Sequence, residues 1–134
     1  MRITSKLTGG MRFETDIRGH NVIVDLTEAK GGTDTGPMPP ELLVTSLGTC
    51  VGVYAVNFCR KHNLSTEGLL IHTDYEQGTA PSRISHISVT VELPCGVTEE
   101  KLPAFMRTIE QCLVHNTFCQ TPEIKIELAE TCIV

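Results

Sequence analysis

The sequence lacks the long apolar segments that would place it in a membrane or direct it to secretion. Its opening residues, MRITSKLTGG, contain no apolar run resembling that of a signal peptide. No later stretch approaches the roughly 20 apolar residues that a membrane-spanning helix requires. Apolar residues make up 40% of the chain, which is typical of a soluble globular protein. We therefore expect a cytoplasmic protein without a membrane partner.

Concentrated positive charge is also missing. Lysine and arginine together number 11 against 16 aspartate and glutamate residues, and the formal net charge is −5 at pH 7. The one basic cluster is Arg60-Lys61-His62. Because binding to DNA or RNA phosphates needs concentrated lysine and arginine, we expect no nucleic-acid partner.

Several familiar motifs of catalysis and metal binding do not occur. There is no C-x-x-C, so thioredoxin-type and zinc-ribbon interpretations lose their main support. There is also no phosphate-binding glycine loop, no G-x-S-x-G and no H-E-x-x-H. The chain does have six cysteines. Without an export signal they indicate a reducing compartment, where thiols stay reduced unless they are catalytic.

No internal repeat, low-complexity tract or linker divides the 134 residues, a usual length for one domain with its own core. We therefore predict a single domain over residues 1–134. Hydrophobic periodicity predicts the order β-β-β-α-β-β-α-β, an α+β fold with two buried helices against an antiparallel sheet. The predicted segments are strands within 3–26, a helix over 39–62, strands over 68–75 and 84–93, a helix from about 98 to 115, and a strand over 124–128.

The first predicted helix, residues 39–62, is apolar on nearly every side and is therefore expected to be buried. Prolines suit its first turn, and basic residues suit the negative end of its dipole. Gly48 and Gly52 would let another helix approach closely. The apolar residues are Leu42, Leu43, Leu47, Val51, Val53, Tyr54, Ala55 and Phe58.

The second predicted helix begins near Thr98, a suitable N-cap, with Glu99 and Glu100 in its first turn. We expect it to end near His115. Its apolar stripe directs Cys112 toward the core. The stripe consists of Leu102, Phe105, Met106, Ile109, Cys112 and Leu113.

Cys50 and Cys112 lie on these two helices at positions that packing could bring together. Cys50 and Cys59 are about 13 Å apart along one helix, beyond the roughly 7 Å that a disulfide allows between Cα atoms. Cys112 and Cys119 are also too far apart if both are helical. Cys50 and Cys112 could form a reversible dithiol across a helix–helix contact. The alternative is that both only fill the core, since a buried cysteine is ordinarily inert.

A reactive Cys50 also needs a nearby positive charge. It lies well inside its helix, where the N-terminal dipole has faded. Apolar surroundings would suppress its thiolate. Arg12 and Arg18, on the N-terminal strands, are the candidate cations. The alternative is that both are solvated strand arginines.

The second predicted helix also carries residues that could bind a metal. Cys112, His115 and Cys119 fall at helical spacing, so one face could offer three ligands. The helix is expected to end near His115, and no fourth ligand is evident. We therefore predict no metal, and we interpret His115 as a helix-end residue that complements the dipole.

Two longer motifs surround the cysteines. One is Gly36-Pro37-x-Pro39-x-Glu41-Leu42-Leu43 leading into Leu47-Gly48-x-Cys50, and the other is Cys112-x-Val114-His115-x-Thr117 leading into Pro122-x-Ile124. They resemble those of the OsmC/Ohr superfamily, the osmotically induced and organic-hydroperoxide-resistance proteins. The element order and the 62-residue separation of the two cysteines are similar too. The resemblance covers nearly the whole chain.

This resemblance implies an intertwined homodimer with active sites at the subunit interface, and a thiol peroxidase activity. Cys50 would attack the O–O bond and become a sulfenic acid. Cys112 would resolve it as a disulfide, which an external dithiol reduces. No metal or flavin is implied. The family arginine follows a Gly-Gly directly; here Met11 intervenes, so Arg12 is the nearest match and Arg18 stays in reserve.

One position departs from the hydroperoxide-specific members. These carry a glutamate ten residues before the peroxidatic cysteine, where this sequence has Pro40. Glu41 is the next residue, but one helical step rotates a side chain by about 100°. The variant resembles less characterised branches of the superfamily.

We therefore predict a cytoplasmic homodimeric peroxidase that prefers organic hydroperoxides, because the helix around Cys50 is apolar. The alternative is a non-enzymatic protein that binds a hydrophobic small molecule, with the cysteines as packing or as a redox switch. A dimer that consumes no peroxide but holds such a ligand would favour this alternative. A third possibility, a plain structural dimer, would be unchanged when either cysteine becomes serine.

Overall fold

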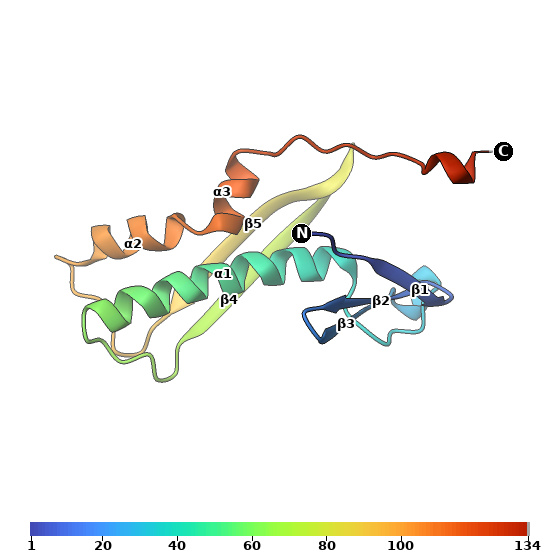
Figure 1. The fold of residues 1–134 in the computed structure, drawn as a ribbon. Helices are drawn as coiled ribbons and strands as arrows, with labels where there is room; N and C mark the ends of the chain where they lie inside the picture. The colour runs from blue at the N-terminus through green and yellow to red at the C-terminus, as the bar shows by residue number, and fades with distance from the viewer. Residues whose placement is uncertain (134) are drawn as a thin grey trace.

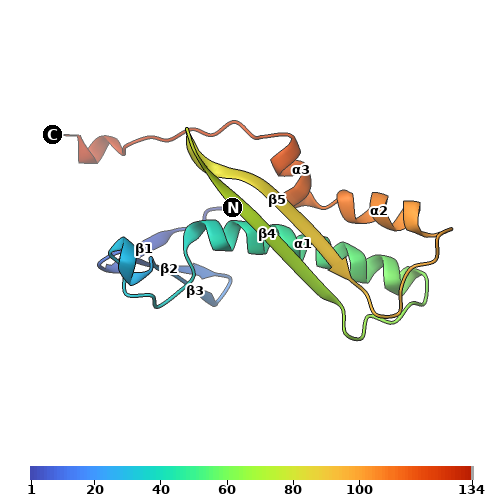
Figure 2. The same cartoon turned by 180° about the vertical axis from the view of Figure 1, so that it is seen from behind.

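The computed structural model describes residues 1–133, which form a three-stranded sheet, a two-stranded sheet and three α-helices. The long helix α1 and the shorter α2 and α3 lie on one face of the β4–β5 hairpin, and the three-stranded sheet lies near the N-terminal end of α1 (Figures 1 and 2). The bounds are β1 Ser5–Gly9, β2 Arg12–Ile17, β3 His20–Val24, α1 Pro39–Lys61, β4 Leu70–Thr79, β5 Ser82–Glu92, α2 Leu102–Glu110 and α3 Leu113–Cys119, with short 3-10 turns at Glu28–Lys30 and Glu130–Cys132. The α+β class is confirmed.

The strands β1, β2 and β3 form an antiparallel meander in the first part of the chain. The turn from β2 to β3 places Arg18 at φ 57° and Gly19 at φ 83°. Two successive left-handed residues match the right-handed twist of the flanking strands, and glycine adopts that conformation without strain. The meander therefore forms from contiguous sequence.

The loop from Asp25 to the start of α1 is held by one buried carboxylate. Asp25 is 1% exposed. Its Oδ2 accepts hydrogen bonds from the backbone N–H and hydroxyl groups of Thr33 and Thr35, at 2.7 to 3.2 Å, and its Oδ1 accepts the Leu26 N–H at 2.8 Å. A buried charge needs such partners. The loop therefore enters α1 in a fixed position.

Helix α1 spans Pro39–Lys61, close to the predicted range. Its start is fixed by proline in the first turn and by Glu41, whose Oε2 accepts the Met38 N–H at 2.7 Å. It ends at His62, just before Asn63 in the left-handed conformation. Its buried residues are Val44, Leu47, Gly48, Val51, Ala55, Phe58 and Cys59.

One face of α1 is exposed, contrary to the expectation of full burial. Leu43 is 45% exposed and Val53 is 58% exposed. By length and composition α1 could also cross a membrane, whereas the sequence was expected to contain no such segment. Of its most apolar stretch, 39% is buried inside the chain. Core helices of soluble proteins have the same composition. Helix α1 therefore packs one face against the rest of the chain and leaves another face exposed.

Gly48 and Gly52 admit a strand rather than the helix that the sequence suggested. A Cβ atom at Gly48 would collide with Thr73 Oγ1, and one at Gly52 would lie 3.2 Å from Ile71 Cγ1. Both neighbours belong to β4. The two glycines therefore set how closely α1 packs on the hairpin.

The hairpin of β4 and β5 presents an apolar face to the helices. The register pairs Ile71 with Val91, Thr73 with Val89 and Tyr75 with Ile87. Successive pairs at a spacing of two residues point to the same side of the sheet. Ile87, Val89 and Val91 pack against the core of α1 and α2.

The second predicted helix is two helices, α2 and α3. Lys101, not Thr98, is the N-cap of α2. The helix is interrupted at Gln111 and Cys112. Cys112 has an extended backbone, and its Sγ accepts the His115 N–H at 3.2 Å. A side chain that caps a new helix satisfies backbone donors at the break. Cys112 is fully buried there, as its place in the apolar stripe predicted.

The predicted last strand, residues 124–128, does not form in this chain. Ile124, Ile126 and Leu128 are 77%, 92% and 67% exposed, and the segment pairs with neither sheet. A strand is stable only when an edge pairs with it. Within residues 1–133 the single predicted sheet is therefore two separate sheets.

Candidate functional site

Cys50 and Cys112 face one another across the contact between α1 and the α2–α3 junction. Cys50 is half-buried in the middle of α1, and Cys112 is fully buried. Cys50 lies near enough to raise the pKa of the Cys112 thiol. Both pack in one cluster with Leu47, Val51 and Ile109. The fold therefore brings two thiols together from positions 62 residues apart.

The surroundings hold Cys112 in its protonated form. Burial raises the pKa of the Cys112 thiol, and the adjacent Cys50 raises it further. The backbone N–H groups of His115 and Val114 act in the opposite direction, because they stabilise a negative sulfur. At neutral pH Cys112 is therefore a thiol that can donate a proton. Two backbone N–H groups can stabilise the thiolate that remains.

An apolar cavity of about 250 Å³ lies beside the thiol pair. Leu47 and Val51 flank Cys50 on α1 and both line this cavity, and Ile109 comes one turn before Cys112. The other lining residues are Ile87, Val89, Met106, Glu110 and His115. Such a cavity has room for a small apolar molecule among residues that neighbour the two cysteines in the sequence and in the core.

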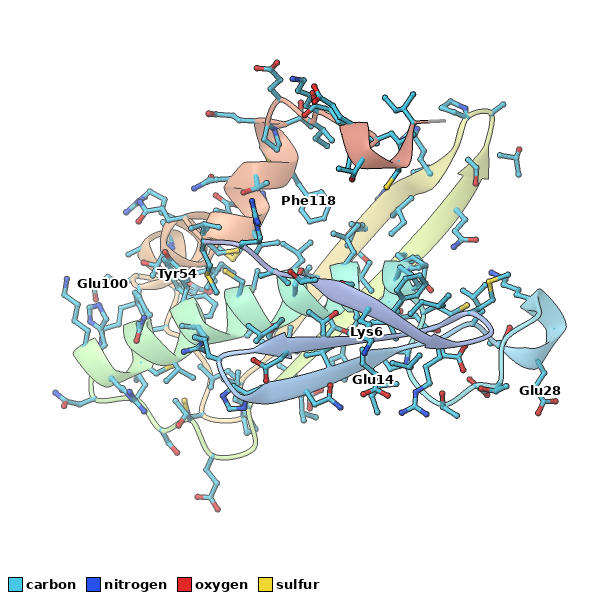
Figure 3. All side chains as sticks on the ribbon, turned by 45° about the vertical axis from the view of Figure 1, so that its right-hand side comes forward. Lys6, Glu14, Glu28, Tyr54, Glu100 and Phe118 are labelled. Atoms are coloured by element: carbon cyan, nitrogen blue, oxygen red, sulfur yellow. The ribbon has the colours of Figure 1, made fainter. Side chains whose placement is uncertain are left out.

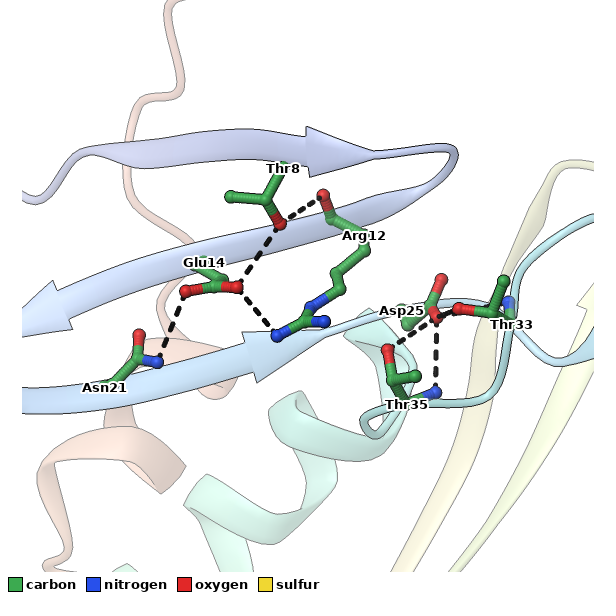
Figure 4. A network of polar contacts seen from close by, with 7 residues as sticks. All are labelled: Thr8, Arg12, Glu14, Asn21, Asp25, Thr33 and Thr35. Carbon is green, nitrogen blue, oxygen red and sulfur yellow. Dashed lines mark hydrogen bonds and ion pairs between the residues drawn. The ribbon is translucent and has the colours of Figure 1, made fainter.

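Arg12 lies apart from the two cysteines in this chain. Its Nη2 forms an ion pair with Glu14 Oε1 at 2.7 Å, and Glu14 also accepts hydrogen bonds from Thr8 and Asn21 (Figure 4). The Nε atom of Arg12 is buried without a partner among the described residues. Arg18 is exposed in the β2–β3 turn. Among residues 1–133, no hydrogen bond or ion pair joins either arginine to Cys50 or Cys112.

Glu41 is occupied elsewhere. Its carboxylate accepts the Met38 N–H at the start of α1, which is the role of a capping residue. Glu41 therefore stabilises the start of the helix and does not pair with Arg12.

The three candidate metal ligands do not converge. Cys112 uses its sulfur for the His115 backbone N–H, whereas the His115 imidazole Nε2 lies 3.5 Å from Cys119 Sγ. Residues 1–133 contain no group of three or more His, Cys, Asp or Glu side chains that could hold a metal ion.

Sequence reasoning missed the contact between His115 and Cys119. The two residues are four positions apart on α3, and residues at this spacing lie on the same side of a helix. That spacing was available in the sequence. It was interpreted only as a possible part of a metal site, because the break at Cys112 was not foreseen.

Residues 32–128 match the sequence pattern of a family described as OsmC-like protein. No curated protein sequence matches the chain. Among solved structures, the fold is similar to a Psychrobacter arcticus protein provisionally described as an osmotic stress induced and detoxification response protein. The TM-score is 0.78 with 18% identity over 86% of this chain and 85% of that one.

Two further solved structures have the same fold. An OsmC-like protein of Mycoplasma pneumoniae gives a TM-score of 0.74 with 19% identity, over 90% of this chain and 87% of that one. An organic hydroperoxide resistance protein of Legionella pneumophila gives 0.65 with 13% identity, over 88% and 89%. The likeness extends over most of each chain.

Proposed function

The chain belongs to the OsmC-like protein family, and on that premise we propose that it is a thiol-dependent peroxidase that reduces organic hydroperoxides. The observation that carries the proposal is the contact between Cys50 and Cys112 beside an apolar cavity. The description of the Legionella pneumophila relative as an organic hydroperoxide resistance protein supports the same role.

In the first step Cys50, as a thiolate, attacks the terminal oxygen of the hydroperoxide. The S–O bond forms and the O–O bond breaks, so the alkoxide leaves with the electron pair and takes up a proton to become an alcohol. Cys50 is oxidised to a sulfenic acid. The half-buried position of Cys50 gives a small molecule access to the sulfur.

In the second step Cys112 resolves the sulfenic acid. Its sulfur attacks Cys50, the S–S bond forms, and hydroxide leaves and is protonated to water. The raised pKa of Cys112 keeps its proton until this step, and the N–H groups of His115 and Val114 stabilise the sulfur as the proton leaves. An external dithiol then reduces the disulfide by two exchanges and becomes a disulfide itself.

The cavity favours organic hydroperoxides over hydrogen peroxide. Its walls are formed mainly by aliphatic side chains from α1, β5 and α2. An alkyl or aryl group placed there is removed from water, which stabilises the complex by about 25 cal/mol per Å² of apolar surface buried. Hydrogen peroxide has no such group.

We propose Arg12 as the cation that stabilises the Cys50 thiolate. Within one chain Arg12 is bound to Glu14 and does not contact Cys50. The contact therefore requires the N-terminal sheet of a second copy, or a shift of the sheet in the same chain. We propose that a second copy supplies it, in a cytoplasmic homodimer with its sites at the subunit interface and without nucleic-acid or membrane partners.

A second candidate function is binding of an apolar small molecule without turnover. The cavity beside the cysteines supports it, because the cavity does not depend on thiol chemistry. A protein that retains an apolar ligand in native mass spectrometry, yet consumes no peroxide, would identify this function.

The peroxidase proposal is tested by mass spectrometry of the reduced protein after one equivalent of cumene hydroperoxide, with hydrogen peroxide in parallel. We expect rapid loss of two hydrogens, mapped by peptide analysis to a Cys50–Cys112 disulfide, and faster with the organic peroxide. Cys112→Ser should accumulate a sulfenic acid at Cys50 that dimedone traps, and Cys50→Ser should not react at Cys112.

The control is Cys132→Ser, which removes an exposed thiol outside the pair and should behave as the unchanged protein. Arg12→Gln should slow the first step, whereas Arg18→Gln should not. Free thiols that persist at both Cys50 and Cys112 would contradict the peroxidase proposal and favour the binding of an apolar small molecule.

A further inference from the structure

We propose that Cys119 and His115 form a second reactive thiol site, distinct from the Cys50–Cys112 pair, which exchanges with small disulfides. Cys119 lies exposed at the end of α3, and its Sγ is 3.5 Å from Nε2 of the half-buried His115. The proposal does not depend on the peroxidase activity.

The hydrogen bonds of His115 fix which ring nitrogen can accept a proton. Its Nδ1 lies 2.7 Å from the carbonyl oxygen of Glu110. A carbonyl can only accept, so Nδ1 carries the hydrogen and the neutral ring has its lone pair on Nε2. Nε2 therefore accepts the S–H of Cys119. A thiol, a base and a group that orients the base are the elements of an activated nucleophile.

The other exposed thiols of the described chain have no comparable base. Cys95 Sγ donates to the carbonyl oxygens of Ser65 and Gly96, at 3.2 and 3.4 Å. A carbonyl oxygen holds the thiol hydrogen but does not remove it. Cys132 lies 3.9 Å from the hydroxyl of Thr131. Among the exposed cysteines of residues 1–133, only Cys119 contacts an imidazole.

A cavity of about 260 Å³ reaches the imidazole that contacts this thiol. It is lined by His115 and by Phe118, the neighbour of Cys119. Phe118 projects from α3 toward the β4–β5 hairpin (Figure 3). The other lining residues are Leu47 of α1 and Ile84, Ser85, His86 and Ile87 of β5. A small molecule in this cavity can therefore rest against the imidazole that bonds Cys119.

The reaction is a thiol–disulfide exchange. His115 Nε2 takes the proton of Cys119, and the thiolate attacks one sulfur of a small disulfide. The new S–S bond joins Cys119 to half of the reagent, and the old S–S bond breaks. The leaving thiolate takes the proton back from His115. No further oxidant is needed, because the incoming disulfide is reduced as Cys119 is oxidised.

His115 also connects this site to the first one. Its backbone N–H donates to Cys112 Sγ, and its ring lines the cavity beside Cys50 and Cys112. A mixed disulfide on Cys119 therefore lies against a residue that, like Leu47 and Ile87, lines both cavities.

The test treats the full, reduced protein with oxidised glutathione and follows each cysteine by peptide mass spectrometry. Dithiodipyridine, whose released thione absorbs light, gives the rates. We expect Cys119 to react at least about tenfold faster than Cys132, since general-base assistance is commonly worth that much or more. His115→Gln should lower the Cys119 rate to that of Cys132 without changing the Cys132 rate.

His86→Gln is the matched control, because His86 lines the same cavity but has no bond to Cys119; it should leave the Cys119 rate intact. Cys119→Ser should remove the fast reaction while cumene hydroperoxide still produces the Cys50–Cys112 disulfide. Equal rates at Cys119 and Cys132, or a Cys119 rate that His115→Gln does not change, would overturn the proposal. Neither outcome bears on whether Cys50 reacts with peroxide.

Discussion

At the scale of single residues, Asp25 determines how the loop before α1 is held. The hydrogen bond from the Thr33 hydroxyl contributes most to holding the pKa of the Asp25 carboxyl well below its usual range. Burial acts in the opposite direction, and the bonds from Thr33, Thr35 and Leu26 together outweigh it. The ionised carboxylate is therefore favoured by the folded state, so its protonation favours unfolding.

Asp25→Asn should destabilise the protein, most strongly at neutral pH. A carboxyl whose folded pKa is lowered stabilises the fold above its unfolded pKa of about 3.9, and this stabilisation is lost as the pH falls through the folded value. Urea unfolding from neutral pH down into the acid range measures it. The difference between Asp25→Asn and the unchanged protein should shrink on acidification.

Asp34→Asn, at an exposed position in the same loop, is the control and should show no such trend. A difference for Asp25→Asn that stays constant with pH would contradict the role of the charge.

The burial of a residue could be predicted from the sequence where the spacing of apolar residues along one helix determined it. The burial of Cys112 followed from the apolar stripe of its helix, and its approach to Cys50 required only that the two helices pack. The position of Arg12 could not be predicted, because no local pattern says where a three-stranded sheet lies relative to helices far along the chain. Glu41 had a capping position that could have been recognised from the prolines before it.

At the scale of elements, the close packing of α1 on β4 depends on one glycine more than on the other. The Cβ of Gly48→Ala would meet Thr73 Oγ1, on a β-branched side chain with little freedom to turn away. At Gly52 the nearest atom, Ile71 Cγ1, is 3.2 Å away, and a small shift relieves the contact.

We therefore predict that Gly48→Ala lowers the free energy of unfolding by about 1–2 kcal/mol. An overpacking cost of about 1–3 kcal/mol exceeds a gain of up to about 1 kcal/mol in helix propensity. Gly52→Ala, in which the same gain meets a weaker contact, should be neutral or slightly stabilising. Urea unfolding of both variants measures the difference.

Adding Thr73→Ala to Gly48→Ala should recover part of the loss, because it removes the atom that the new methyl group meets. If both single variants were equally stable, the packing of β4 on α1 would not depend on Gly48.

Elements were predicted well where local pattern and tertiary packing agreed, and poorly where they did not. The hairpin and α1 follow their periodicity. The break between α2 and α3 was missed because the apolar stripe continues through it, although Cys112 leaves the helix to cap the next one. Residues 124–128 alternate between apolar and polar side chains, as a strand does. This alternation does not show whether the edge of a sheet is available to pair with them.

At the scale of the whole molecule, the chain exposes more apolar side chain than its size would require. The exposed face of α1, with Leu43 and Val53, and the alternating apolar residues of the tail are large surfaces without partners in residues 1–133. Such surfaces usually mark an interface. They are what a second copy would cover in the proposed homodimer.

We predict that Ile126→Lys weakens or abolishes the dimer, because a charge would enter the apolar side of the tail that the second copy is proposed to cover. Glu127→Lys is the matched control, since Glu127 lies on the other side of the tail, where it pairs with Lys125. Sedimentation velocity measures the oligomeric state of both variants. A monomeric unchanged protein, or a dimer equally unaffected by both changes, would contradict this assignment of the tail.

The order of the elements along the chain also determines when the thiol pair is completed during synthesis. Both sheets and α1 are encoded before residue 93, and they can pair with their neighbours as the ribosome delivers them. Cys50 is made 62 residues before Cys112, which takes about 3 to 12 s at 5–20 residues per second. For that time the nascent chain carries the first sulfur without the second. A growing chain exposed to oxidants would therefore be most vulnerable at Cys50, before α2 and α3 close over it.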